Sequence, residues 1–285
     1  MELQRKPLTG ILLALVGGLV ISLDIPVIRL GESAPWTFIA FRGFGMSLVL
    51  GLILLFGRKL TDTPPHPFHD TDFVIVGVLY GLSSILFTTA VFTTSTANLV
   101  FILAFNPLIA AMFSWWLIGE RPSLITWIAI ALTIIGVGII VADGVETGTA
   151  FGNALALLTA IVLGLSIVKT RQSGKDMSLA GTLGGLIAGL FALPMVILAG
   201  QWPHALGWVL LNALVMAPAG AFALSLAPRY IPAPQVAMFF LLETILAPVW
   251  VWLIFSETPT TQSLIGGGVV LLAITFHSAI QLKRS

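Results

Sequence analysis

Apolar residues dominate the chain in ten long runs, and short polar or charged segments separate these runs. Each run has the length of about 20 residues that an α-helix needs to cross the roughly 30 Å hydrocarbon core of a bilayer. The runs lack the period-two alternation of barrel strands, so helices are predicted. The predicted spans are residues 8–28, 36–56, 73–93, 97–118, 124–142, 151–169, 179–199, 205–227, 233–255 and 263–281.

Composition and charge narrow the class of protein. Hydrophobic residues make up 58% of the 285 residues and charged residues only 9%, whereas about a quarter of the residues of a soluble domain are charged. A net charge of +1 gives no basic field for a nucleic-acid partner. With no cysteine, the chain has no thiol nucleophile and lacks a common metal ligand. An all-α polytopic membrane protein is predicted, with the lipid bilayer and a small molecule as partners and without a cofactor.

The basic residues predict the orientation. Placing the N-terminus in the cytoplasm puts 11 of the 13 Lys and Arg residues on the cytoplasmic side, and only Arg29 and Arg42 lie elsewhere. Because positive charge accumulates in cytoplasmic loops, both termini are expected to be cytoplasmic, in the inner (plasma) membrane. The cytoplasmic loop TDTPPHPFHDTD holds His66 and His69, but a short Pro-rich connection is favoured there over a metal site.

The second half of the chain repeats features of the first. At an offset of 137 residues, FSWWLIGERP (113–122) pairs with WVWLIFSETP (250–259), and both contain W-x4-E-x-P. G-x-x-L-A-L opens the first span of each half, at Gly10 and at Gly152. Two repeats of five spans are therefore predicted, residues 1–146 and 147–285. Because five is odd, the second repeat should be inverted in the membrane.

The repeat also aligns polar residues inside the spans. At the same offset Asn98 corresponds to Gln235 and Asn106 to Glu243. Residues eight apart lie on one broad face of a helix, about 12 Å apart along its axis. Their depth is near the bilayer midplane, where inverted repeats place substrate sites. Together with Tyr80 of the third span, these four residues form the predicted substrate site, in which amides recognise zwitterionic groups.

Three charged residues in the spans leave more than one role open. Glu243 either couples transport to protons or acts as a fixed hydrogen-bonding group, because an unpaired acid facing lipid is costly. Asp24 and Arg42 are expected to form a buried ion pair, which is favoured over a substrate contact; snorkelling of Arg42 to the headgroups is the alternative. Asp24 also precedes Ile-Pro, where the first span is expected to kink or end.

The two W-x4-E-x-P segments, together with ANLVFILAFNPLIAA, FFLLETILAPV and APWTFIAFRGFGMSLVL, resemble the two EamA-type repeats of the drug/metabolite transporter superfamily. The resemblance extends over nearly the whole chain. It implies ten helices in an inverted five-plus-five arrangement, with spans one to four and six to nine around a central cavity. The chain departs from the family pattern in having Glu243-Thr244 where an acid is often followed by proline, and Asp24 where tryptophan is common in span one.

An exporter of a small metabolite, with amino acids or similar amphiphilic compounds as substrates, is therefore predicted to work by alternating access. A proton-coupled multidrug exporter is the nearest alternative. An intramembrane enzyme is disfavoured because the sequence has no H-E-x-x-H, G-x-S-x-G or P-loop motif, although Asp24 and Glu243 would allow an acid pair. A channel is disfavoured because no loop resembles a selectivity filter.

Overall fold

The computed structural model describes residues 7–56, 63, 67–119, 121–146, 148–227, 230 and 233–284, and within them the chain is helical without a strand. The helices are α1 (Pro7–Ser22), α2 (Asp24–Leu30), α3 (Pro35–Phe56), η3 (Pro67–His69), α4 (Thr71–Thr93), α5 (Thr96–Leu103), α6 (Asn106–Ile118), α7 (Leu124–Glu146), α8 (Ala150–Ser173), α9 (Gly181–Ala199), α10 (Leu206–Leu211), η4 (Asn212–Met216), α11 (Ala217–Leu226), α12 (Ala233–Phe255) and α13 (Thr261–Arg284).

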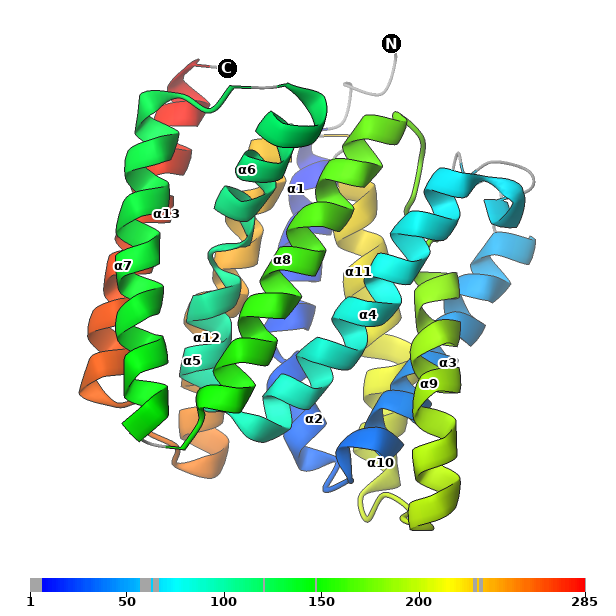
Figure 1. Ribbon diagram of the computed structural model, residues 1–285. Coiled ribbons are helices and arrows are strands. Elements are labelled where there is room, and N and C mark those ends of the chain that lie inside the picture. Colours follow the sequence, from blue (N-terminus) through cyan, green and yellow to red (C-terminus); the bar gives the residue numbers. More distant parts are fainter. Residues whose placement is uncertain are drawn as a thin grey trace.

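Eight helical segments are long and apolar enough to cross a membrane, with α1–α2, α5–α6 and α10–α11 each counted as one segment. In α12 and α13 the described apolar stretches are shorter, Leu242–Phe255 and Thr261–Phe276. The chain is thus an all-helical, polytopic integral membrane protein. The helices pack side by side in a bundle, in which α1 begins at the end where α13 finishes (Figure 1). We call the opposite end of the bundle the far end.

Helix pairs from different parts of the chain make the main contacts. α3 packs on α9, α7 on α13, and α4 on α8, while α1 packs on α11 and α12. Small residues allow the α3–α9 contact, since a Cβ added at Gly43 would lie 2.6 Å from the carbonyl oxygen of Gly185. Because lipid tails are as apolar as leucine, such close van der Waals packing drives helix association in a membrane.

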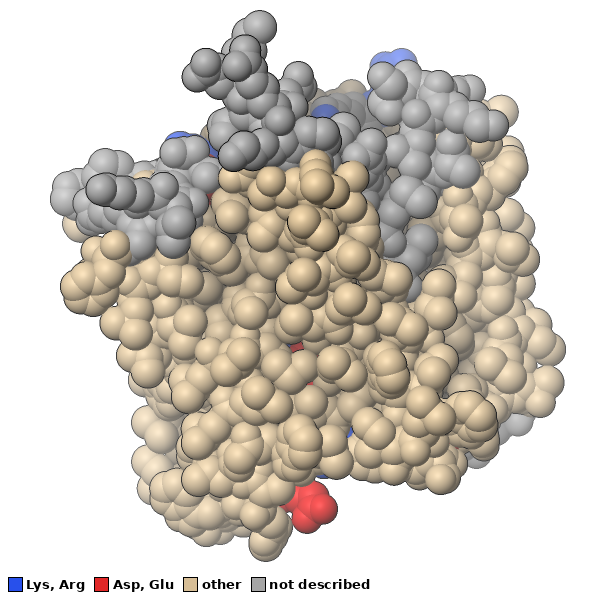
Figure 2. Space-filling view, turned by 180° about the vertical axis from the view of Figure 1, so that it is seen from behind, with Lys and Arg blue, Asp and Glu red and all other residues tan. Residues whose placement is uncertain are grey.

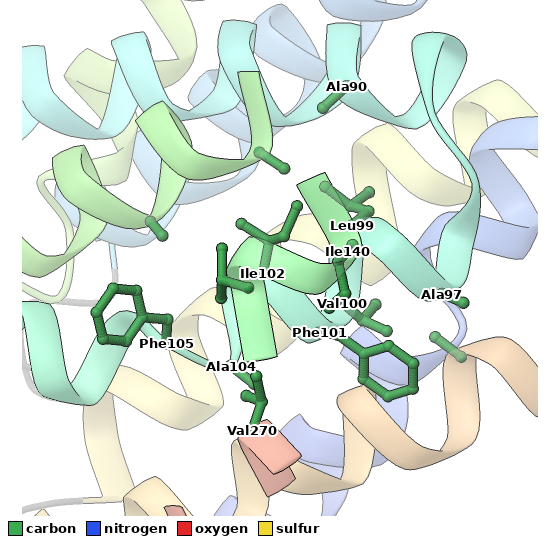
Figure 3. Packing of buried hydrophobic residues seen from close by; sticks show 14 of the residues in the cluster. Ala90, Ala97, Leu99, Val100, Phe101, Ile102, Ala104, Phe105, Ile140 and Val270 are labelled. Carbon is green, nitrogen blue, oxygen red and sulfur yellow. The ribbon is translucent and has the colours of Figure 1, made fainter. Parts of the chain in front are cut away.

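The interior around α5 is apolar and closely packed, while the outside of the bundle is also apolar. Leu99, Val100 and Ile102 of α5 are buried against residues such as Ile140 and Val270 (Figure 3). The described outer surface is almost entirely uncharged in the view of Figure 2, where acidic and basic atoms show mainly at the ends of the bundle. An apolar outside and sparse charge are what a lipid-facing surface requires.

Three of the membrane segments are interrupted, and each interruption comes shortly before a proline. The α1–α2 break at Leu23 precedes Pro26, the α5–α6 break at residues 104–105 precedes Pro107, and the π-helical segment η4 precedes Pro218. Proline removes the N–H that would bond the carbonyl four residues earlier and crowds that carbonyl. In η4 the chain adapts by a wider turn, in which the Ala217 N–H donates to the Asn212 carbonyl.

Candidate functional site

Asp24, Arg42 and Asn212 form a hydrogen-bonded group inside the bundle, which we call the central cluster. The guanidinium of Arg42 binds both carboxylate oxygens of Asp24, with Nη1 to Oδ1 and Nη2 to Oδ2 each at 2.8 Å. Arg42 Nη1 also donates to Asn212 Oδ1, and Asn212 Nδ2 donates to Asp24 Oδ1 at 2.6 Å. Asp24 and Asn212 are buried. The fork-shaped guanidinium thus matches the carboxylate in the bidentate geometry that makes such pairs strong.

The helix interruptions supply this cluster with its residues. Asp24 is the first residue of α2, directly after the break, and Asn212 is the first residue of the π segment η4. Arg42 reaches them from the middle of α3, and its guanidinium carbon lies 5.9 Å from the centre of the Phe87 ring of α4. Cations favour the face of an aromatic ring. Interrupted membrane helices are where secondary transporters build their sites.

Glu243 of α12 belongs to the electrostatic surroundings of the central cluster. It is half-buried and interacts electrostatically with both Asp24 and Arg42. It has no hydrogen bond or ion pair to any residue that the structure describes. Nearby, Trp250 Nε1 donates to Ser22 Oγ at 3.2 Å, which ties α12 to the end of α1 beside the break. The cluster and its neighbour therefore hold two carboxyl groups, Asp24 and Glu243, against one guanidinium.

The structure does not gather the five residues of the predicted substrate site in one place. Tyr80 lies near Thr170 of α8 and packs with an apolar cluster of α4 and α9. Asn106 donates through Nδ2 to the carbonyl of Ala160 at 3.2 Å. Asn98 lies in a second polar group at the far end, and the side chain of Gln235 is outside the described residues. Of the four whose side chains the structure describes, only Glu243 lies beside the central cluster.

An ion pair between Arg29 and Glu257 links distant parts of the chain at the far end. Arg29 lies in the last turn of α2, and Glu257 lies between α12 and α13. Arg29 Nη2 also donates to the carbonyl of Thr94 at 3.2 Å, and Glu257 Oε1 accepts from the N–H of Thr96 at 3.1 Å. Both charges are therefore matched.

Amide and hydroxyl groups continue this network into the bundle. Ser263 Oγ donates to Asn98 Oδ1, and Asn98 Nδ2 donates to Asn153 Oδ1 at 3.4 Å. Asp143 accepts from Thr260 Oγ1 at 2.7 Å. We call these residues, together with the Arg29–Glu257 pair, the far-end cluster. It joins α2, α5, α7, α8 and α13 where these helices begin or end.

The sequence contains weak signals for three residues of the two clusters that its pattern does not assign to a site. Asn212 is the single amide in the stretch from Leu206 to Leu224. Arg29 is one of the two basic residues that the positive-inside assignment left unplaced, and Glu257 is the acid of the second W-x4-E-x-P segment. None of these signals names a partner, because the partners lie up to 228 residues apart in sequence.

No metal site emerges from the described part of the chain, in which no three His, Asp or Glu residues are placed to share an ion. His66 of the predicted cytoplasmic loop lies outside that part. Two open hollows lie elsewhere on the molecule. One, of about 680 Å³, is lined by Glu32, Trp202 and His204 among others, and one, of about 290 Å³, lies between Trp115 and Trp127. Neither hollow is lined by the central cluster.

Comparison with known proteins gives a family and a fold. The profile of the EamA-like transporter family matches the chain twice, over residues 8–142 and residues 150–279. A solved structure described only as "Crystal structure of protein" superposes with a TM-score of 0.64 at 15% sequence identity, over 95% of this chain and 97% of the other. At this identity the likeness concerns the fold alone. No curated protein matches the chain.

Proposed function

The chain belongs to the EamA-like transporter family, and from this premise we propose that it is a secondary transporter that exports a small metabolite by alternating access. Amino acids and similar amphiphilic compounds are the substrate class that we propose to test first. The observation that carries the proposal is the central cluster: three hydrogen-bonded polar side chains, at two helix interruptions, inside a mainly apolar bundle. Ionisable groups at such depth are costly and mark transport pathways.

We further propose ten membrane spans in two inverted repeats, residues 1–146 and 147–285. The packing supports this arrangement, because exchanging the halves converts each main contact into another one that is present. The α4–α8 contact becomes α11–α1, and α6–α8 becomes α12–α1, whereas α3–α9 and α7–α13 convert into themselves. Two copies related by a twofold axis in the membrane plane would produce this pattern.

The far-end cluster supports alternating access, since the Arg29–Glu257 pair holds the proposed first and second repeats together at that end. The internal repeat assigns the same residue types to the other end: Arg171 corresponds to Arg29 at an offset of 142 residues, and Glu120 to Glu257 at an offset of 137. Glu120 lies outside the described residues. We propose that these two counterparts hold the opposite side closed when the far end opens.

We propose the inner (plasma) membrane as the location, with both termini in the cytoplasm and the far end outside. The distribution of Lys and Arg supports this orientation, because 11 of 13 are then cytoplasmic. Export then means that substrate reaches the central cluster from the end at which α13 finishes and leaves at the far end.

The test is counterflow in proteoliposomes, with a panel of radiolabelled amino acids and amphiphilic compounds. We expect exchange of at least one compound by the wild-type protein, and loss of that exchange in Asn212→Leu, which removes an amide from the central cluster. Thr133→Val is the matched control, because Thr133 is a buried residue of α7 whose hydroxyl has no partner among the described residues. No exchange of any compound, or equal exchange by Asn212→Leu, would count against the proposal.

A further inference from the structure

The central cluster has an unequal number of positive and negative groups, and its single cation is already engaged. Both Nη atoms of Arg42 bind Asp24, and Nη1 also binds Asn212. Of the guanidinium nitrogens, only Nε has no partner among the described residues. A substrate carboxylate could therefore form a bidentate pair with the Arg42 guanidinium only by displacing Asp24. This exchange would leave the buried Asp24 carboxylate without its cation, with only the Asn212 amide as a partner, which is strongly unfavourable.

Glu243 is in the opposite situation. Leu242, the residue before it, packs against Gly18 of α1, and Trp250 is bound to Ser22, two residues before Asp24. The electrostatic neighbours of Glu243 are Asp24, which repels it when both are ionised, and Arg42, which Asp24 already neutralises. No described residue forms a hydrogen bond or ion pair with it. Arg29 is the other basic residue that the predicted orientation does not place on the cytoplasmic side. It is bound to Glu257 at the far end. Among the described residues, the site thus holds two carboxyl groups and one guanidinium, so ionised Glu243 would be matched only by a further cation.

From this imbalance we infer that the transported substrate carries a cationic amino group, which lies beside Glu243 and restores the charge balance of the central cluster. The inference rests on the proposed function and narrows its substrate class. In an amphiphilic substrate the ammonium group is the part that is recognised, and a carboxylate on the same molecule does not add affinity. Arg42 acts as a positioning residue, because it fixes Asp24 and Asn212 around the place of the ammonium group.

The surroundings of Glu243 fit an ammonium group better than an anion. Trp250 lies two turns further along α12, on the same side of the helix, and its N–H is already bound to Ser22. The indole therefore has no free N–H to donate to an anion. Ammonium groups bind carboxylates and aromatic faces, whereas an anion would meet the carboxyl groups of Asp24 and Glu243.

The experiment compares three compounds that share one carbon skeleton. These are leucine, its decarboxylated form 3-methylbutylamine and its deaminated form 4-methylpentanoate. Because a neutral amine crosses membranes unaided, binding to the purified full-length protein is measured by scintillation proximity, with matched triples of other skeletons in parallel. We expect each amine to bind within threefold of its amino acid or more tightly, and the deaminated acid at least tenfold more weakly than the amine.

Two substitutions at Glu243 separate recognition from folding. Glu243→Gln keeps the shape but removes the charge, and we expect it to weaken amine binding at least tenfold. Glu243→Asp keeps the charge and should retain the preference for the amine over the deaminated acid. Thr133→Val, in α7, should bind like the wild type. If Glu243→Gln unfolds in detergent, the inference is tested by the ligand triples on the wild type and by the Glu243→Asp variant.

The outcomes distinguish this inference from the proposed function. If deaminated acids bind as tightly as amines, if only compounds with a carboxylate bind, or if no amine of any triple binds, the inference is wrong. Counterflow of some compound in proteoliposomes would still support a transporter in each of these cases. If amines bind but nothing is exchanged across the membrane, the ammonium site is supported and the transport proposal fails.

Discussion

The central cluster and the far-end cluster are both polar groups in an apolar bundle, but they differ in position and in charge balance. At the far end Arg29 faces Glu257 one to one, and backbone groups of Thr94 and Thr96 complete the contacts. In the centre a single guanidinium serves Asp24, while Glu243 has no partner among the described residues. The far-end residues lie at or near helix ends, whereas Asp24 follows a break within a span and Asn212 begins a π-helical segment within a span.

This difference teaches how to interpret buried charge in a membrane protein. A buried charge that is paired with an opposite charge and fully hydrogen-bonded connects the helices that carry the two residues. It has no capacity left to bind a substrate. A group left without a partner must be protonated, hydrated or bound by something else. Two criteria therefore distinguish a polar cluster that holds the bundle closed from one that recognises a substrate. They are the charge balance of the cluster and the position of its residues in their helices. On these criteria the far-end cluster belongs to closure and the central cluster to recognition.

The largest expected effect comes from breaking the ion pair of the central cluster. Arg42→Leu leaves the buried Asp24 carboxylate without its cation, and we expect a loss of about 3–5 kcal/mol of stability. Thermal unfolding in detergent, followed by intrinsic fluorescence, measures it. Adding Asp24→Asn to Arg42→Leu should recover part of the loss. Arg121→Leu is the control, because Arg121 is exposed; an equal effect of both single substitutions would mean that water fills the central cluster.

The boundaries of the helices could be predicted well from the sequence, but the contacts of the site could not. Runs of apolar residues ended close to the ends of helices such as α3, α4 and α9, because only apolar residues are tolerated in lipid. The first span, expected to kink or end at Asp24, is interrupted at Leu23. The interruption before Pro107 has no equivalent in α12, which is continuous through Glu243-Thr244, where the corresponding proline is missing.

The candidate site depended on helix neighbours that no spacing reveals. The eight-residue spacing of Asn98 and Asn106 predicts a shared face, but it does not say which helix lies opposite that face. Asn98 meets Ser263, 165 residues away, and Asn106 meets the backbone of α8. Asp24 and Asn212 are 188 residues apart, so their contact follows from the packing of α2 against η4 and α3.

A second prediction tests whether the central cluster depends on close approach of the helices that hold it. A Cβ added at Gly18 of α1 would lie 2.7 Å from the carbonyl oxygen of Phe239, one turn before Glu243 on α12. Because a backbone oxygen cannot move aside, Gly18→Ala should push α12 away from α1 and cost about 1–3 kcal/mol. Gly138→Ala is the control, since nothing lies within 4 Å of its added Cβ. If both variants unfold at one temperature, the close contact is absent in the membrane.

A third prediction concerns opening at the far end. Glu257→Gln removes the charge that faces Arg29, and because both side chains are partly exposed we expect a change of about 1 kcal/mol or less. That change corresponds to at most about fivefold in the population of the open state. The chain has no cysteine, so Thr96→Cys supplies a single reporter; Thr96 is buried and its hydroxyl has no described partner.

Maleimide should label this cysteine up to fivefold faster in the Glu257→Gln protein than in its parent. Glu32→Gln is the matched control, because Glu32 is an exposed acid just beyond Arg29. It should leave the labelling rate unchanged. Equal rates in all three proteins would show that the Arg29–Glu257 pair does not hold the far end closed.

The smallest effect is expected for an ion pair outside the membrane spans, which serves as the reference for both clusters. Lys175 Nζ lies 2.6 Å from Asp70 Oδ2 and 3.1 Å from Asp72 Oδ2, on a surface exposed to water. The hydrogen bond from Lys175 lowers the pKa of Asp70, and the two acids raise the pKa of Lys175. The stability contributed by Asp70 is therefore lost as pH falls through its lowered pKa, and that contributed by Lys175 is lost as pH rises through its raised pKa.

Lys175→Gln should leave the unfolding temperature at neutral pH unchanged within error, because water screens exposed charges. It should also remove the small decreases in unfolding temperature that the pair causes at acidic and at alkaline pH. A destabilisation as large as that of Arg42→Leu would show that charge balance alone, without burial, decides the energetics of ion pairs in this protein.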